Sequence, residues 1–157
     1  MPMEHPMTKT LHPIAGAIAL LTILTFWLST ALSEVFGSEA VVIAVKTLVP
    51  WGLLILVPAL IAVGLSGTLL GKRRRGPLIE RKQKRMPFIA ANGLLVLVPA
   101  AFYLSFKAQA GAFDTGFYVV QALELLAGAT NITLLGLNMR DGLRMTGKLR
   151  RQPAARR

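Results

Sequence analysis

Long apolar runs alternate with short polar segments along the chain. The first run, residues 13–32, has twenty residues without a charge, and further runs cover about 47–70, 87–106 and 117–138. A helix rises about 1.5 Å per residue, so about twenty apolar residues cross the roughly 30 Å hydrocarbon core of a bilayer. The pattern predicts an all-α polytopic membrane protein with four transmembrane helices in an up-down bundle.

Prolines indicate where these helices depart from regular geometry. The second apolar stretch covers residues 41–70 and is interrupted only by Lys46, which makes it too long for one untilted span. Pro50 lacks a backbone donor and favours a break or kink just before it. Pro87 suits the first turn of the third span, and Pro99 is the expected site of any kink there.

Basic residues cluster between the runs and at the ends of the chain. The chain has 18 Lys and Arg against 7 Asp and Glu, and 16 of the basic residues lie in segments 1–12, 71–86 and 139–157. Short loops rich in Lys and Arg stay on the cytoplasmic side during insertion. We therefore expect a cytoplasmic N-terminal tail (1–12), a transmembrane domain (13–138) with a basic cytoplasmic loop (71–86), and a basic cytoplasmic tail (139–157). The expected location is the bacterial inner membrane.

A cleaved signal peptide is an alternative interpretation of the first run. Lys9, the apolar stretch and the small-residue pattern Ser29-x-Ala31 fit one. The stretch is long for that purpose, and Trp27 lies close to the supposed cleavage site. We favour a span; cleavage would leave three.

Polar residues recur on one face of the fourth span. At steps of three and four the sequence places Gln121, Glu124, Gly128, Asn131, Leu135 and Asn138. Such spacing puts them on one stripe of a helix. Polar groups in lipid cost free energy unless they contact protein or water, so this stripe is predicted to face the other helices.

Glu124 is the most informative of these residues. It lies about seven residues from the start of its span, a depth of about 10 Å, where an ionised carboxylate needs a partner, water or a proton. Lys46 is a candidate partner at similar depth, although its long stem also allows it to reach the interface. Glu124 is then either a proton-carrying or ligand-binding group, or a structural one. We favour the structural role, because Glu34 is assigned to the outer loop and no second carboxylate is apparent within the spans.

Two further features predict helix packing. Asn92 and Asn131 lie at comparable depth, so we expect a hydrogen bond between them. Small residues four apart occur at the cytoplasmic ends of the first two spans, at positions 15 and 19 and at positions 67 and 71. Such faces allow close helix approach.

Candidate cofactor ligands are few. The chain has no cysteine and only two histidines, His5 in the tail and His12 at the start of the first span. A haem held by two histidines on neighbouring helices is therefore excluded. One histidine with a methionine near the same face, among Met86, Met139 and Met145, is a remaining haem alternative. We expect no cofactor, no metal and no catalytic residue.

The basic loop predicts a contact with anionic lipid headgroups, because each Lys or Arg near such a surface contributes about 1 kcal/mol. The residues expected to make this contact are Arg73, Arg74, Arg75, Lys82, Lys84 and Arg85. Nucleic acid is not an expected partner, since the loop has no interleaved aromatic residues and lies against the bilayer.

These features favour a non-enzymatic accessory or scaffold subunit that binds lipid, a partner membrane protein or a second copy of itself. The whole chain resembles small four-span bacterial inner-membrane proteins in hydropathy pattern alone. A small carrier or proton-coupled translocation subunit centred on Glu124 is the alternative. A quinone- or haem-associated redox anchor is the second alternative.

Overall fold

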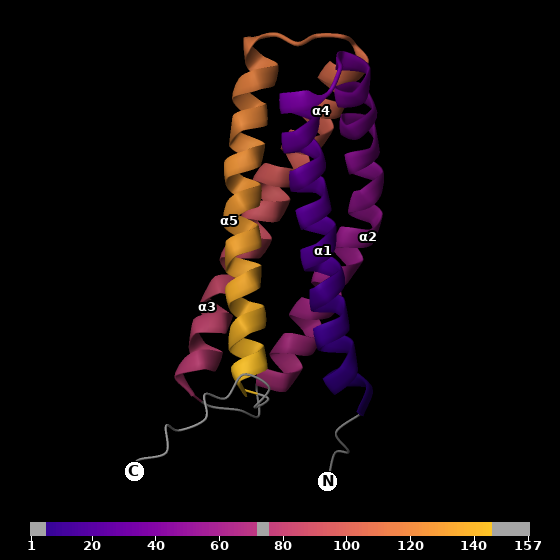
Figure 1. The fold of residues 1–157 in the computed structure, drawn as a ribbon. Coiled ribbons are helices and arrows are strands. Elements are labelled where there is room, and N and C mark those ends of the chain that lie inside the picture. Colours follow the sequence, from indigo (N-terminus) through magenta and orange to yellow (C-terminus); the bar gives the residue numbers. More distant parts are fainter. Residues whose placement is uncertain (1–5, 72–75, 146–157) are drawn as a thin grey trace, which may run out of the picture.

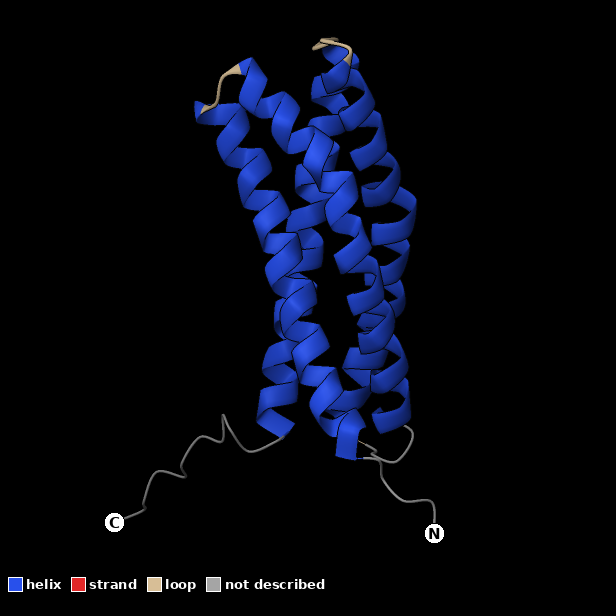
Figure 2. Ribbon diagram, turned by 90° about the vertical axis from the view of Figure 1, so that its right-hand side faces the viewer, coloured by secondary structure: helices blue, strands red, loops and turns tan. Residues whose placement is uncertain are grey.

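The computed structural model describes residues 6–71 and 76–145, and these are almost wholly helical (Figure 2). The elements are α1 (Pro6–Phe36), α2 (Glu39–Gly71), α3 (Pro77–Asn92), the π-helix η1 (Gly93–Leu97), α4 (Val98–Gln109) and α5 (Thr115–Met145). No β-strand occurs in the described ranges. Four helical segments, 10–36, 39–70, 77–109 and 115–145, are long and apolar enough to cross a membrane. The protein is therefore an all-helical membrane protein with four candidate spans.

The helices extend beyond the apolar runs that predicted them. Residues 77–86, which the charge pattern assigned to the basic loop, form the first turns of α3. Pro77 lies in the first turn, where its missing N–H costs nothing, and Gly76 adopts a φ of 151° that favours glycine. Lys, Arg, Gln and Glu are also good helix formers, so charge does not end a helix. Likewise α1 begins in the predicted N-terminal tail and α5 continues to Met145.

The prolines have different effects in two helices. Helix α2 continues through both Pro50 and Pro58, so of the break or kink predicted before Pro50 the break is not found. In the third span the irregularity is η1, which ends just before Pro99. There the N–H of Val98 bonds to the carbonyl of Gly93, five residues back rather than four. The wider turn is the local response of the helix ahead of the proline ring.

Figure 1 shows α1 and α2 side by side, with α5 beside α1 and α3 leaning on α5. A core cluster joins all of these helices through Ala19, Ile23, Leu56, Ala59, Ile89 and Leu135. A second cluster, near the α4–α5 turn, contains Val42, Leu104, Ala108 and Phe117. Large apolar side chains elsewhere, such as Leu21, Trp51 and Leu126, are exposed as a lipid-facing surface requires.

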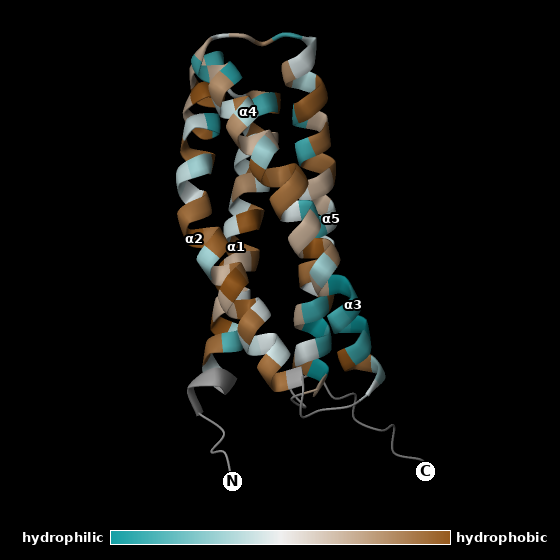
Figure 3. Ribbon diagram, turned by 180° about the vertical axis from the view of Figure 1, so that it is seen from behind, coloured by the Kyte–Doolittle hydropathy of each residue, from teal (hydrophilic) through white to brown (hydrophobic). Residues whose placement is uncertain are grey.

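The two ends of the bundle differ in charge. At the end where α3 begins and α5 ends, the described basic residues are Arg81, Lys82, Lys84, Arg85, Arg140 and Arg144; we name this the basic end. Figure 3 shows the hydrophilic residues of α3 gathered there. The α1–α2 turn and the α4–α5 turn lie at the opposite end.

Close approach of α1 and α2 depends on small side chains in the core. Ala19 is fully buried in that cluster, so Ala19→Leu should lower the free energy of unfolding by about 1–3 kcal/mol through overpacking. Ala44→Leu is the matched control, because Ala44 is exposed on α2. Thermal unfolding in nanodiscs measures both variants. Equal stability of the two would contradict the packing described.

Candidate functional site

A column of polar side chains runs along the inner face of α5. The predicted stripe is confirmed: Gln121, Gly128, Asn131, Leu135 and Asn138 are buried, and the Glu124 side chain is only 13% exposed. The column continues one step further to Asp141, which is 2% exposed. The hydrogen-bond network of the column extends to α1, α2 and α3. The contacts fall into three layers at different depths of the bundle.

The first layer, toward the α1–α2 turn, contains a buried ion pair. The Nζ atom of Lys46 lies 2.6 Å from Oε2 of Glu124, and the Lys46 side chain is 1% exposed. Lys46 also donates to Oγ1 of Thr30 at 3.5 Å, and the amide of Gln121 donates to the same Glu124 oxygen at 3.5 Å. The layer thus links α1, α2 and α5. Lys46 binds within the bundle rather than extending to the interface.

Glu34 brings a second carboxyl group to this layer. It belongs to the last turns of α1, not to the outer loop, and it interacts electrostatically with both Lys46 and Glu124. Its Oε1 atom is buried without a hydrogen-bond partner among the described residues, as is Oε1 of Gln121. The expectation that the spans hold no second carboxylate is therefore wrong, because Glu34 lies in a candidate span near the Lys46–Glu124 pair.

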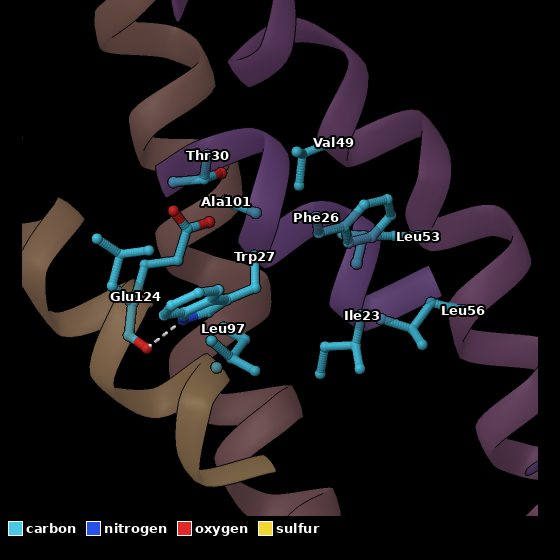
Figure 4. Close-up of a pocket in the computed structure, with 12 residues that line it drawn as sticks. Ile23, Phe26, Trp27, Thr30, Val49, Leu53, Leu56, Leu97, Ala101 and Glu124 are labelled. Carbon is cyan, nitrogen blue, oxygen red and sulfur yellow. Dashed lines mark hydrogen bonds between the residues drawn. The ribbon is translucent and has the colours of Figure 1, made fainter. Parts of the chain in front are cut away.

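A small cavity adjoins this layer (Figure 4). Its volume is about 50 Å³, and Glu124 and Thr30 are its polar lining side chains apart from the indole of Trp27. The Trp27 N–H donates to the Leu125 carbonyl at 2.8 Å and so ties α1 to α5. A cavity of this size accommodates a few water molecules but no larger organic ligand.

The second layer, at mid-depth, consists of amides. The predicted hydrogen bond between Asn92 and Asn131 is present at 2.9 Å. Asn92 also donates to the Ala127 carbonyl at 2.9 Å, and Asn131 donates to the Ile89 carbonyl at 3.3 Å. These bonds join α3 to α5 directly beside η1, which begins at Gly93, the residue after Asn92.

The third layer lies at the basic end. Arg85 of α3 donates to Oδ2 of Asp141 at 2.8 Å and to the side chain of Asn138 at 3.4 Å. Asn138 in turn donates to the sulfur of Met86 at 3.5 Å. This layer provides a second ion pair between α3 and α5.

A separate series of hydrogen bonds connects α3 to α1 and α2 near this layer. Lys82 lies 2.8 Å from Nε2 of His12, and Nδ1 of His12 lies 2.8 Å from the hydroxyl of Ser66. Gly67 allows this approach, because a Cβ there would lie 3.2 Å from the His12 ring. Both ring nitrogens of His12 are thus engaged by protein groups, which disfavours an axial haem ligand at this position. Among the described residues no group of three or more potential metal ligands occurs.

The predicted lipid-contact residues fall into three groups. Arg73, Arg74 and Arg75 lie outside the described residues. Lys82 and Arg85 donate hydrogen bonds inside the bundle, whereas Lys84 is exposed. The charged segment could not be divided in this way while it was assigned to a loop; in the helix α3, Lys82 and Arg85 lie three residues apart and so share one face.

At the opposite end, a surface pair orders the start of α5. Asp114 accepts a hydrogen bond from Lys107 and another, at 3.0 Å, from the Phe117 N–H. These two bonds hold the pKa of Asp114 below its ordinary value, and the bond from Lys107 has the larger effect. Asp114 therefore caps the helix that carries the polar column.

Three residues in or near the column were not predicted as site residues from the sequence. Asp141 follows Asn138 at the same three-residue step, so the periodicity itself was a signal for it. To predict Glu34 as a site residue, one would have to know that α1 extends to Phe36. His12 required knowledge that α3 extends to Lys82, which no pattern in the apolar runs indicates.

Comparison with protein-family models, with curated proteins and with solved structures finds no match for this chain.

Proposed function

We propose that the protein is a non-enzymatic membrane subunit, an accessory or scaffold that binds anionic lipid or a partner membrane protein. It forms an up-down bundle of four spans in the bacterial inner membrane, with both ends in the cytoplasm. The positive-inside rule supports this orientation, because the basic end would then face the cytoplasm.

The division of its charged side chains carries this proposal. Charges inside the bundle bind one another, as Lys46 binds Glu124 and Arg85 binds Asp141. Such pairs hold helices in register and leave little chemistry to offer a substrate. Exposed cations instead gather at the basic end, where Arg81, Lys84 and Arg144 lie on the surface next to exposed apolar helix faces.

This arrangement suits a lipid surface. The apolar faces contact acyl chains, and each exposed Lys or Arg at the basic end adds about 1 kcal/mol toward an anionic headgroup. The exposed residues come from both α3 and α5, so one headgroup layer contacts two helices that the third layer of the column already joins.

Lipid retention tests the proposal. In native mass spectrometry the protein should retain phosphatidylglycerol in preference to phosphatidylcholine, and the combined variant Arg81→Gln, Lys84→Gln and Arg144→Gln should lose most of that preference, since three contacts of about 1 kcal/mol are removed. Lys107→Gln, which removes a cation at the opposite end, is the control and should keep it. Equal retention of the two lipids by the unaltered protein would refute the lipid-binding role.

A second candidate function rests on Glu34. Lys46 pairs with Glu124, Glu34 lies near enough to interact electrostatically with both, and Glu124 lines a cavity with room for water. A proton-coupled translocation subunit needs carboxyl groups in such a place.

Proton flux into proteoliposomes distinguishes this candidate from the scaffold. If Glu34 and Glu124 exchange protons with the bulk, Glu34→Gln should abolish a pH-gradient-driven flux that the unaltered protein supports. Glu39→Gln is the matched control, because Glu39 is an exposed carboxyl at the start of α2, and it should leave the flux unchanged. No flux above empty liposomes with the unaltered protein would eliminate the proton-coupled candidate and leave the scaffold.

A further inference from the structure

At the basic end, the first turns of α3 reach α1 and α2 through one series of side-chain hydrogen bonds, whereas further along α3 Ile89 packs in the core cluster with Ala19 and Leu56. No Cα atom of α3 lies within 8 Å of a Cα atom of α1 in the described residues, and α3 packs mainly on α5. Lys82, His12 and Ser66 connect the three helices there, with distances of 2.8 Å at both junctions.

With Lys82 charged, the chemistry of this bridge assigns one tautomer to His12. A lysine ammonium has donors only, so the Nε2 atom that it contacts is the acceptor and carries no hydrogen. The ring hydrogen is then on Nδ1 and is donated to the Ser66 hydroxyl, which itself donates to the Ala62 carbonyl at 2.5 Å. In this series of hydrogen bonds from Lys82 to Ser66, every donor therefore has an acceptor only while the His12 imidazole is neutral.

A proton on Nε2 would remove the acceptor and place two cations 2.8 Å apart. The charged groups that face the His12 ring are Lys82 and, acting through Lys82, Asp141 of α5. From α2 the ring meets the Ser66 hydroxyl and the Val63 backbone, neither of which titrates in the ordinary pH range. Asp141 is already paired with Arg85, so among the described residues no unpaired carboxylate compensates a second positive charge at His12.

The remainder of α3 is arranged for movement as a unit. Arg85 and Asn92 hold it on α5, through Asp141 and Asn131, and neither bond involves His12. Just beyond Asn92 the π-helix η1 interrupts the regular α-helical bonding between α3 and α4. Such a turn is a natural place for a helix to change direction.

We propose that His12 is a proton-binding site that latches α3 to α1 and α2. The neutral imidazole closes the latch by accepting from Lys82 and donating to Ser66. Binding of one proton opens it, and the basic end of α3 then separates from α1 and α2 together with the end of α5 to which Arg85 binds it. Histidine is the side chain whose ordinary titration lies closest to neutral pH, so the latch opens only on the acid side of neutral pH. This inference does not depend on the proposed function.

Spin-label distances test the latch directly, because the chain has no cysteine of its own. Labels at Thr10→Cys and Gln83→Cys report the separation of α1 and α3, from exposed positions beside His12 and Lys82. In phosphatidylcholine nanodiscs, pulsed EPR should give a short, narrow distance distribution at about pH 8 and a longer, broader one at about pH 5. A distribution that does not change with pH would overturn the proposal.

Two variants and one control pair attribute the change to His12. With His12→Gln, which cannot titrate, the distribution should be the same at both pH values; a retained pH response there would also overturn the proposal. With Lys82→Met the long distribution should appear at both pH values. Labels at Gln83→Cys and Arg144→Cys report α3 against α5 and should not respond to pH, since the Arg85–Asp141 pair is unaffected. A pH response of that pair would show general loosening rather than a latch.

Discussion

The structure depends on the requirement that a charge inside the hydrocarbon region has a partner there. Water is absent from that region, so an isolated ammonium or carboxylate costs several kcal/mol, and removing one member of a buried pair is correspondingly severe. Lys46 and Glu124 meet this requirement for each other at 2.6 Å, and in doing so they set the depth of α2 relative to α5. Lipid supplies no hydrophobic force between helices, so such polar contacts and small-residue packing determine which faces meet.

The three layers of the polar column have different roles in that scheme. The first layer contains the ion pair, the nearby Glu34 and the small cavity, so its carboxyl groups are the ones suited to exchange a proton. The second layer, formed by the amides of Asn92 and Asn131, is neutral, and its hydrogen bonds only join helices. At the basic end, Arg85 and Asp141 fix α3 on α5, which leaves the Lys82–His12 bridge as a separate connection to the rest of the bundle. A scaffold and a pH-sensitive bundle are therefore compatible descriptions of one molecule.

Much of this architecture follows from sequence because hydropathy and helical periodicity are local properties. The four spans, the inward face of α5 and the Asn92–Asn131 bond were all predictable from residue spacing and depth. Helix limits were not, since charged residues such as those of 77–86 continue a helix as readily as they form a loop. Glu34 and His12 were missed for that reason: Glu34 joins the site because its own helix α1 extends past its apolar run, and His12 because α3 does. The prolines show the same limit, because packing in α2 overrides the break that Pro50 favours locally.

The central claim is that Lys46 and Glu124 stabilise the bundle as a pair, and a double-mutant cycle in nanodiscs tests it most directly. Lys46→Met and Glu124→Leu should each lower the free energy of unfolding by about 3–5 kcal/mol, because each leaves a buried charge without its partner. The double variant should recover most of that loss, since two apolar side chains of similar size replace both charges. Additive losses in the double variant would contradict the account, because they would mean that the two residues act independently of each other.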